Sequence, residues 1–353
     1  MSMHAHFAIP GDIASLTGGY AYDREVLARA RQFGVDLAHI ALPAGFPTPS
    51  GDDLARTADI LRALPRDEVL LIDGLAFGAF TPDLLGLLPA HTMALVHHPL
   101  ALESGIGMER AAELRVSERW ALAHSCGVIV TSASTKEIVI ADYGVPADRI
   151  EIAMPGTARA SRALGSIGAP HLLAVGSLTP RKGHDILVQA LDGLADLDWS
   201  LTIVGSPDRA AGHAARLRDM IASSVAGSRI NLAGEVSDAV LASLYSSADV
   251  FVMPSLYEGY GMVLGEAMVR GLPIVATTGG AAAQTVPDKA ALKVAPGDVL
   301  ALRDALRAIL SDEELRARLS AAAWEAGQGL PTWDDTAHIV VTALKQAAGS
   351  RNS

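Results

Sequence analysis

Two glutamates within the stretch from Val250 to Gly271, which reads VFVMPSLYEGYGMVLGEAMVRG, have the type and spacing to bind hydroxyl groups. Seven residues separate Glu258 from Glu266. Because a carboxylate can accept two hydrogen bonds, one acid could bind the neighbouring hydroxyls of a ribose while the other binds hydroxyls of a second ring. The pair therefore predicts a site that holds both ends of a nucleotide sugar. The alternative is a solvated loop acid and a solvated helix acid.

The residues around the two glutamates predict a strand, a loop and a helix. Val250–Met253 is a short apolar run that suits a buried parallel strand, and Pro254–Gly261 contains proline and glycines typical of a loop. Met262–Arg270 has helical spacing, which a Gly-Leu-Pro sequence then ends. A helix that begins at the carboxyl end of a strand offers free backbone N–H groups to an anion. We therefore expect phosphate groups beside the amides of Gly261–Val263.

Two adjacent cations, Arg181 and Lys182, lie in another predicted strand–loop–helix segment. They follow the apolar run His171–Val175 and precede the helical stretch Asp185–Leu194. Such a pair is ordinarily solvated, but at the end of a strand it would face phosphates and neutralise a leaving nucleoside diphosphate without a metal. The sequence has no Asp-x-Asp motif and no Cys/His set with ligand spacing, so we expect no metal site.

The first half of the chain contains a glycine pair and a histidine pair in places where ligands bind. Gly18 and Gly19 precede a helix expected near Ala21, and glycines there would let the backbone approach a ligand closely; a plain turn explains them about as well. His97 ends the apolar run Met93–His97, where α/β proteins bind ligands, and His98 is the second choice. A loop histidine satisfied by its neighbours is the alternative.

Composition limits the classes of partner. The chain has 353 residues, enough for two domains, and half of them are hydrophobic. The formal net charge of −11 argues against nucleic acid, which requires a basic face. A single cysteine, Cys126, permits no internal disulfide and favours a reducing, cytoplasmic setting. No signal peptide or apolar run of membrane-spanning length is apparent, whereas peripheral membrane contact stays open.

Short apolar runs alternate with helical stretches along the whole chain and predict parallel sheets with right-handed crossovers. The fold class expected is α/β, with two Rossmann-like, doubly wound parallel-sheet domains. We expect these domains at residues 1–162 and 163–331, with a terminal helix of about 332–353 crossing back to the first. The candidate strands are Ala5–Ile9, Val35–Leu42, Glu68–Ile72, Met93–His97, Val128–Thr131, Ile150–Met154, His171–Val175, Ser200–Val204, Arg229–Leu232, Val250–Met253, Ile274–Thr277 and Leu292–Val294.

The string from Pro254 through both glutamates to Pro273 resembles the signature of retaining family 4 glycosyltransferases, or glycosyl transferases group 1, which have the GT-B fold. The resemblance covers nearly the whole chain and is most specific over Val250–Gly280. It implies two Rossmann-like domains facing a cleft, with the acceptor on the first and the donor on the second. It also implies that Glu258 binds the donor sugar and that Glu266 binds the ribose.

Further residues take roles that this resemblance implies. Arg181 and Lys182 resemble the family's phosphate clamp, although Ser177 stands where many members have arginine, which leaves Arg181 to supply the charge. Gly234 and Val236 would lie against the nucleotide base. The expected catalytic set is His97, Glu258, Arg181 and Lys182, and the expected donor-binding set is Gly18, Gly19, Ser177, Gly234, Val236, Gly259, Gly261, Met262, Val263 and Glu266.

The function expected from the resemblance is transfer of a hexose-type sugar from a UDP- or GDP-linked donor to an unidentified hydroxyl-bearing acceptor, with retention and without a metal or other cofactor. Two alternatives keep the same fold: a nucleotide-sugar epimerase or hydrolase, and a nucleotide-sugar-binding protein without catalysis. A nicotinamide-dependent oxidoreductase is the least favoured, because no G-x-G-x-x-G fingerprint follows the opening strand of either half.

Overall fold

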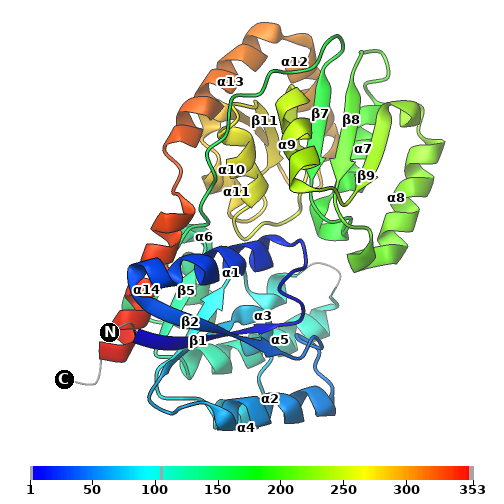
Figure 1. Cartoon of the computed structure of the whole chain (residues 1–353). Coiled ribbons are helices and arrows are strands. Elements are labelled where there is room, and N and C mark those ends of the chain that lie inside the picture. The colour runs from blue at the N-terminus through cyan, green and yellow to red at the C-terminus, as the bar shows by residue number, and fades with distance from the viewer. Residues whose placement is uncertain (1–2, 104–105, 350–353) are drawn as a thin grey trace. The chain divides into compact units, whose positions relative to one another are not determined.

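The computed structural model describes residues 3–103 and 106–349 and divides the chain into two compact units (Figure 1). Unit 1 contains residues 1–156 and 331–353, and unit 2 contains residues 157–330. Residues 157–162 lie with unit 2, where Arg159 donates to the carbonyl of Gly327 at 2.7 Å. Each unit is described by itself below.

Unit 1 is built on a six-stranded, all-parallel sheet in the order β2-β1-β3-β4-β5-β6. The reversal of winding falls between β1 and β3. The strands are β1 Met3–Pro10, β2 Val35–Leu42, β3 Val69–Asp73, β4 Thr92–Val96, β5 Gly127–Val130 and β6 Ile150–Ile152. The α-helices are α1 Gly18–Arg29, α2 Gly51–Ala63, α3 Gly74–Phe77, α4 Pro82–Leu85, α5 Met108–Ala123, α6 Ala133–Tyr143 and α14 Trp333–Gly349.

Unit 2 repeats the pattern with the order β12-β11-β10-β7-β8-β9, again all parallel. Its strands are β7 His171–Val175, β8 Ser200–Val204, β9 Ile230–Gly234, β10 Val250–Met253, β11 Ile274–Thr277 and β12 Ala291–Val294. Its α-helices are α7 His184–Asp192, α8 Ala211–Ser223, α9 Asp238–Ser247, α10 Met262–Met268, α11 Ala282–Thr285, α12 Val299–Ser311 and α13 Glu313–Gln328.

Each sheet is buried on both faces, which explains why its strands are continuous apolar runs. All five residues of β3 and all four of β10 are buried. Successive side chains of a strand point to opposite faces, so Leu70 belongs to one core cluster of unit 1 and Leu71 to the other. The predicted fold class is confirmed, and five predicted strands have the observed bounds, for example Val35–Leu42 and Ser200–Val204.

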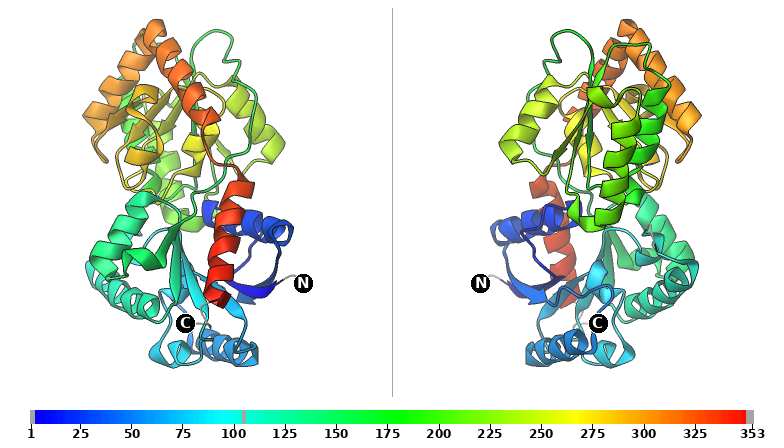
Figure 2. Two further views of the ribbon diagram at one scale, coloured as in Figure 1. Left: turned by 90° about the vertical axis from the view of Figure 1, so that its left-hand side faces the viewer. Right: turned by 90° about the vertical axis from the view of Figure 1, so that its right-hand side faces the viewer.

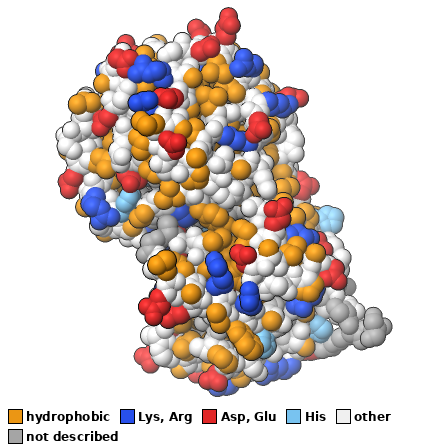
Figure 3. Space-filling model, turned by 180° about the vertical axis from the view of Figure 1, so that it is seen from behind, with side chains coloured by type: hydrophobic (Ala, Val, Ile, Leu, Met, Phe, Trp, Pro, Cys, Tyr) orange, Lys and Arg blue, Asp and Glu red, His pale blue; other side chains and the backbone are white. Residues whose placement is uncertain are grey.

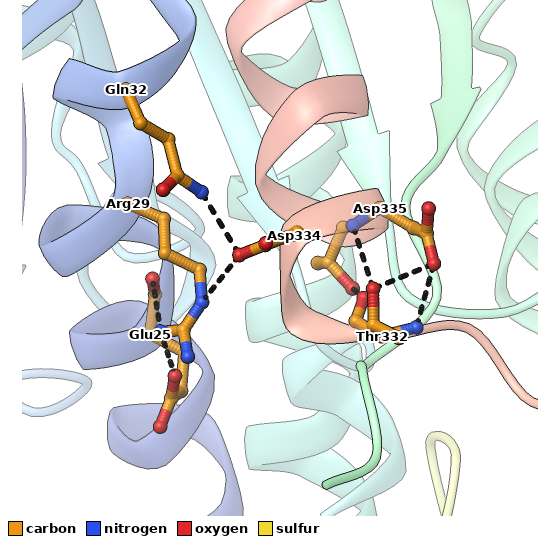
Figure 4. Close-up of polar contacts among 7 residues, drawn as sticks. Glu25, Arg29, Gln32, Thr332, Asp334 and Asp335 are labelled. Carbon is orange, nitrogen blue, oxygen red and sulfur yellow. Dashed lines mark hydrogen bonds and ion pairs between the residues drawn. The ribbon is translucent and has the colours of Figure 1, made fainter. Parts of the chain in front are cut away.

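Helix α14 completes the core of unit 1. Val340, Val341 and Leu344 join the cluster formed with β1, β3 and α1, and Figure 2 shows this helix alongside the strands of the first sheet. Its start is fixed by Thr332, whose hydroxyl accepts from the amide of Asp335 while the Asp335 carboxylate accepts from the Thr332 amide at 2.8 Å (Figure 4).

Polar contacts also join α14 to α1 and to the short 3₁₀ turn Ala30–Phe33 that follows it. Asp334 accepts hydrogen bonds from Arg29 at 3.0 Å and from Gln32 at 2.9 Å, and Arg29 also pairs with Glu25 (Figure 4). These contacts are exposed or partly exposed, so each adds little stability by itself. They fix where the helix lies, whereas its apolar face supplies most of the docking energy.

Acidic and basic side chains are interspersed on the face of the molecule seen in Figure 3. Among the described residues, no helix is both long enough and apolar enough to cross a membrane.

Candidate active site

The winding of the second sheet reverses between β7 and β10. The chain runs outward from β7 through β8 to β9, then returns to the other side of β7 with β10. In open parallel sheets, ligands bind beyond the carboxyl ends of the strands at such a reversal. The loop after β7 carries Arg181 and Lys182, and the loop after β10 carries Glu258. Sheet topology thus brings the acid and the two cations of the sequence prediction to one place.

Glu258 is the centre of a buried ionic cluster and is only 5% exposed. Its Oε1 accepts hydrogen bonds from Lys182 Nζ and Ser255 Oγ, both at 2.6 Å, and its Oε2 lies 3.3 Å from an Arg181 nitrogen. Burial alone raises the pKa of Glu258, but the charges of Lys182 and Arg181 outweigh it and hold that pKa at about 2. The carboxylate is therefore ionised at any physiological pH.

The two loops that carry this cluster are also joined through the backbone. Arg181 donates to the Tyr257 carbonyl at 2.7 Å, and the Leu256 amide donates to the Arg181 carbonyl at 2.7 Å. Gly183 allows this approach, because it has a φ of +63° and any Cβ there would collide with the Pro254 carbonyl oxygen. The cations are thus fixed by close packing of the loops as well as by charge.

The segment that follows β11 is hydrogen-bonded to the Glu258 loop. The Glu258 amide donates to the Gly279 carbonyl at 3.2 Å, and the Ala281 amide donates to the Glu258 carbonyl at 2.8 Å. A Cβ on Gly279 or Gly280 would overlap the backbone of residues 256–258. The glycines after β11 therefore let that loop lie directly against the acidic loop.

Glu266 lies in the second turn of α10, where it is half-buried. Tyr245 donates its hydroxyl to Oε2 at 2.8 Å, and the Arg270 guanidinium lies 4.6 Å from the centre of the Tyr245 ring. Burial raises the pKa of Glu266, while Tyr245 and Arg270 lower it in part. Among the described residues, Oε1 has no hydrogen-bond partner, so this carboxylate retains capacity to accept from a ligand.

The remaining donor-binding candidates of unit 2 are distributed along the same edge of the sheet. Gly259 lies in the Glu258 loop, and Gly261, with a φ of +84°, immediately precedes Met262 and Val263 at the start of α10. This helix has only seven residues, so its dipole is weaker than the sequence argument assumed. Ser177 lies in the β7 loop. Gly234 ends β9 and Val236 follows it, with β8 between them and the cluster.

In unit 1, His97 directly follows β4 and meets two buried acids. Its Nε2 lies 3.2 Å from Asp23 Oδ1 and 3.5 Å from Asp73 Oδ2. Asp23 comes from α1 and Asp73 ends β3, next to the reversal of the first sheet. The three side chains each offer one atom within 4.8 Å of the others, which would also suit a cation; direct hydrogen bonding accounts for the same spacing. His98 instead contacts Glu103 at 3.0 Å.

The structure corrects the expected setting of the glycine pair. Gly18 and Gly19 are the first two residues of α1, and not a loop ahead of a helix near Ala21. Thr17 causes the early start, because its hydroxyl accepts from the Tyr20 amide at 3.3 Å and caps the helix. Gly19 lies against His97, since a Cβ there would be 3.4 Å from Cδ2 of the ring.

Residues 162–325, which contain the whole Glu258 cluster and Glu266, match the family model described as glycosyl transferases group 1. This segment belongs to that family. The resemblance predicted from the sequence is thereby confirmed. A D-inositol 3-phosphate glycosyltransferase from Xylanimonas cellulosilytica is 31% identical over 282 residues, which cover 74% of this chain and 66% of that protein. The match thus spans slightly less than two thirds of the relative's length.

Solved structures of low sequence identity share the fold of this chain. Sucrose-phosphate synthase from Thermosynechococcus elongatus has 21% identity and a TM-score of 0.80, covering 97% of this chain and 98% of that one. The Anabaena protein HepE in complex with UDP-glucose has 16% identity and a TM-score of 0.71, covering 98% and 99%. These neighbours confirm the predicted GT-B architecture.

Several residues of the Glu258 and Glu266 region and of the His97 cluster were not assigned from the sequence. Ser255 and Tyr245 hold the two glutamates, yet a serine after a strand and a helical tyrosine carry no distinctive signal. Asp23 was missed because it lies inside a helix. Asp73 was not assigned either; its position at the carboxyl end of a buried run was the available clue.

Proposed function

We propose that this chain is a retaining glycosyltransferase that moves a hexose-type sugar from a UDP- or GDP-linked donor to a hydroxyl-bearing acceptor. The observation that carries the proposal is the buried cluster of Glu258, Lys182 and Arg181 at the reversal point of a group 1 unit. The names of relatives support it, as does the UDP-glucose bound by the Anabaena neighbour. The single cysteine favours the cytoplasm as the compartment.

The two cations would bind the donor diphosphate. Lys182 and Arg181 expose 16% and 17% of their side chains, so a ligand can reach them, yet they are held in place before it arrives. Fixed positive charge beside a leaving phosphate stabilises the transition state without reorganisation, typically by about 10²–10³ in rate per group. This arrangement supports a reaction that requires no metal ion.

The two glutamates would bind the hydroxyl groups at either end of the donor. Glu258 is ionised and can only accept hydrogen bonds, so it suits a sugar hydroxyl once phosphate oxygens share its cations. Glu266 has a free Oε1 on the next helix and suits the ribose diol. In the reaction, the bond from the anomeric carbon to the diphosphate breaks, the acceptor oxygen bonds to that carbon on the same face, and its proton passes to a leaving phosphate oxygen.

A thermal-shift screen of UDP, GDP, ADP and their sugars tests the donor site. Ligand at a concentration 100 times Kd stabilises the folded protein by about 2.7 kcal/mol, and we expect at least one uracil or guanine donor to raise the Tm of unit 2 by about 5–10 °C. Glu266→Ala should abolish the shift. Glu314→Ala is the control, because Glu314 is an exposed acid on α13 of the same unit.

The outcome of this screen separates the candidate functions. No stabilisation of the wild type by any donor contradicts the proposal. If a donor binds, incubation with that donor alone should leave it intact, because transfer needs an acceptor; rapid conversion would indicate the epimerase or hydrolase. Transfer to a panel of hydroxyl acceptors should persist in excess EDTA, and no turnover with any acceptor would indicate a binding protein.

A further inference from the structure

We infer that Asp23 and Asp73 hold the His97 ring as a cation that donates a hydrogen bond from Nδ1 to a substrate oxygen, so that His97 is a donor and not a general base. This inference deepens the proposed glycosyl transfer and rests on it for the identity of the substrate. The two aspartates are positioning residues, since they act through the ring.

The distances within the cluster show which nitrogen of the His97 ring contacts the two aspartates and which one is left for a ligand. Nε2 faces two carboxylate oxygens, from Asp23 at 3.2 Å and Asp73 at 3.5 Å, and both can accept a hydrogen bond. A nitrogen between two such acceptors must carry a proton. Among the described residues, Nδ1 has no hydrogen-bond partner, and the side chain is 20% exposed. Nδ1 is therefore the atom that remains for a ligand.

The burial of the two carboxylates makes a neutral ring unfavourable. Asp23 and Asp73 are 0% and 3% exposed, and two like charges in so dry a place require a compensating cation. Burial lowers the pKa of His97, but the charges and hydrogen bonds of Asp23 and Asp73 outweigh it and raise that pKa to about 10. Burial and the neighbouring Asp73 raise the pKa of Asp23 to about 7. Near pH 7 Asp23 therefore titrates. Burial raises the pKa of Asp73, but its contacts with His97 and Asp23 outweigh burial and lower that pKa, so Asp73 stays ionised and the imidazolium stays charged.

The elements around His97 hold the ring in one orientation. Tyr22 packs edge-on, with ring centres 5.2 Å apart, and its own hydroxyl donates to the Ala153 carbonyl at 3.0 Å. Thr131 donates to the His97 carbonyl at 3.0 Å, and Gly19 gives the ring room against α1. The titratable groups that face the ring are thus Asp23 and Tyr22 from α1 and Asp73 from β3.

The position of the Asp23, Asp73 and His97 cluster in the sheet favours a role in ligand binding in addition to a structural role. The first sheet reverses its winding between β1 and β3, and β4 is the next strand. His97 follows β4 and Asp73 ends β3, so the ring stands where ligands bind in such sheets. An imidazolium there can donate to a phosphate or hydroxyl oxygen but cannot take the proton of an acceptor hydroxyl. That proton has to leave by another route, as the proposed reaction with the phosphate supplies.

NMR of the full-length protein labelled with ¹⁵N-histidine tests the inference without needing catalysis. We expect both His97 nitrogens to carry protons throughout pH 6–8.5. Asp23→Asn should lower the titration midpoint of His97 by about one to two pH units. Asp36→Asn is the matched control, because it removes an aspartate–histidine contact on β2 of the same sheet, where both side chains are more than half exposed. A neutral His97 at pH 7.5 in the wild type overturns the inference.

Two further readouts distinguish a positioning role for Asp23 from general-base catalysis and from metal binding. In the transferase assay, Asp23→Asn should lose activity as pH rises through the new midpoint, whereas a general base would gain it; a gain overturns the inference. Stoichiometric metal in the purified protein, lost in Asp23→Asn, also overturns it in favour of a cation site. If no donor binds but His97 is cationic, the proposed function fails while the charge state of the ring stands.

Discussion

At the scale of single residues, the acids and cations of the site are bound to one another as well as available to a ligand. Glu258 was expected at sugar hydroxyls and Lys182 at phosphates, yet the structure joins them directly at 2.6 Å. Each group therefore has two partners to choose from, protein or substrate. Because the Glu258–Lys182 pair is buried, replacing one of these contacts by a contact with substrate involves a large free-energy change. Removing one of the two side chains leaves the other as an uncompensated buried charge.

This pairing predicts the stability of substitutions at Lys182. Lys182→Met should lower the free energy of unfolding by about 2 kcal/mol. This loss is smaller than the loss expected when a buried acid loses its only cationic partner, because Arg181 stays beside Glu258. Lys182→Met combined with Glu258→Gln should recover most of that loss. Urea unfolding at pH 7 measures both, and an additive double variant would contradict the ionic coupling.

At the scale of elements, strand ends position the chemistry and helices supply the packing that holds them. The loops after β7, β10 and β11 are bonded to one another through backbone groups, so the site does not depend on side chains alone. Buried polar residues also occur away from it. Glu118 on α5 is 1% exposed and accepts from the Leu100 amide at 3.1 Å, and burial raises its pKa to about 7.

Glu118 predicts a pH-dependent stability of unit 1. Its folded pKa exceeds the usual 4.5, so the folded state keeps a proton that the unfolded state loses. The contribution of Glu118 to the free energy of unfolding is therefore largest below pH 4.5, and it is lost as the pH rises to about 7. Glu118→Gln should remove the decline, and its advantage over the wild type should grow by about 3 kcal/mol between pH 5 and pH 8. Urea unfolding measures this, and Glu113→Gln, exposed on the same helix, should show no such trend.

At the scale of the whole molecule, the chain forms two units with separate cores. The clusters around the second sheet contain only residues of unit 2, while one of the two clusters around the first sheet also contains residues of the C-terminal helix α14. Unit 1 is thus completed only when α14 has been made. Val340, Val341 and Leu344 of α14 are at most 1% exposed, so the helix is part of the core and not an accessory.

Truncation should separate the two units. A chain ending at residue 330 loses the burial of three large apolar side chains, worth roughly 5 kcal/mol or more, which is comparable to the whole stability of a domain. Hydrogen exchange should show unit 1 peptides unprotected and unit 2 peptides protected. A fragment of residues 157–330 should unfold cooperatively by itself. Equal protection of unit 1 with and without α14 would contradict this assignment.

The sequence by itself determined the strands, the two sheets and the family, because buried parallel strands are continuous apolar runs and the segment around Glu258 and Glu266 has fixed spacing. It also placed Lys182 and His97 at strand ends. Only the tertiary structure decided which groups meet. Lys182 and Glu258 lie 76 residues apart in sequence, and His97 and Asp23 lie 74 apart. Each pair is brought together by the order of the strands in its sheet and the packing of the connecting segments, which no local pattern encodes.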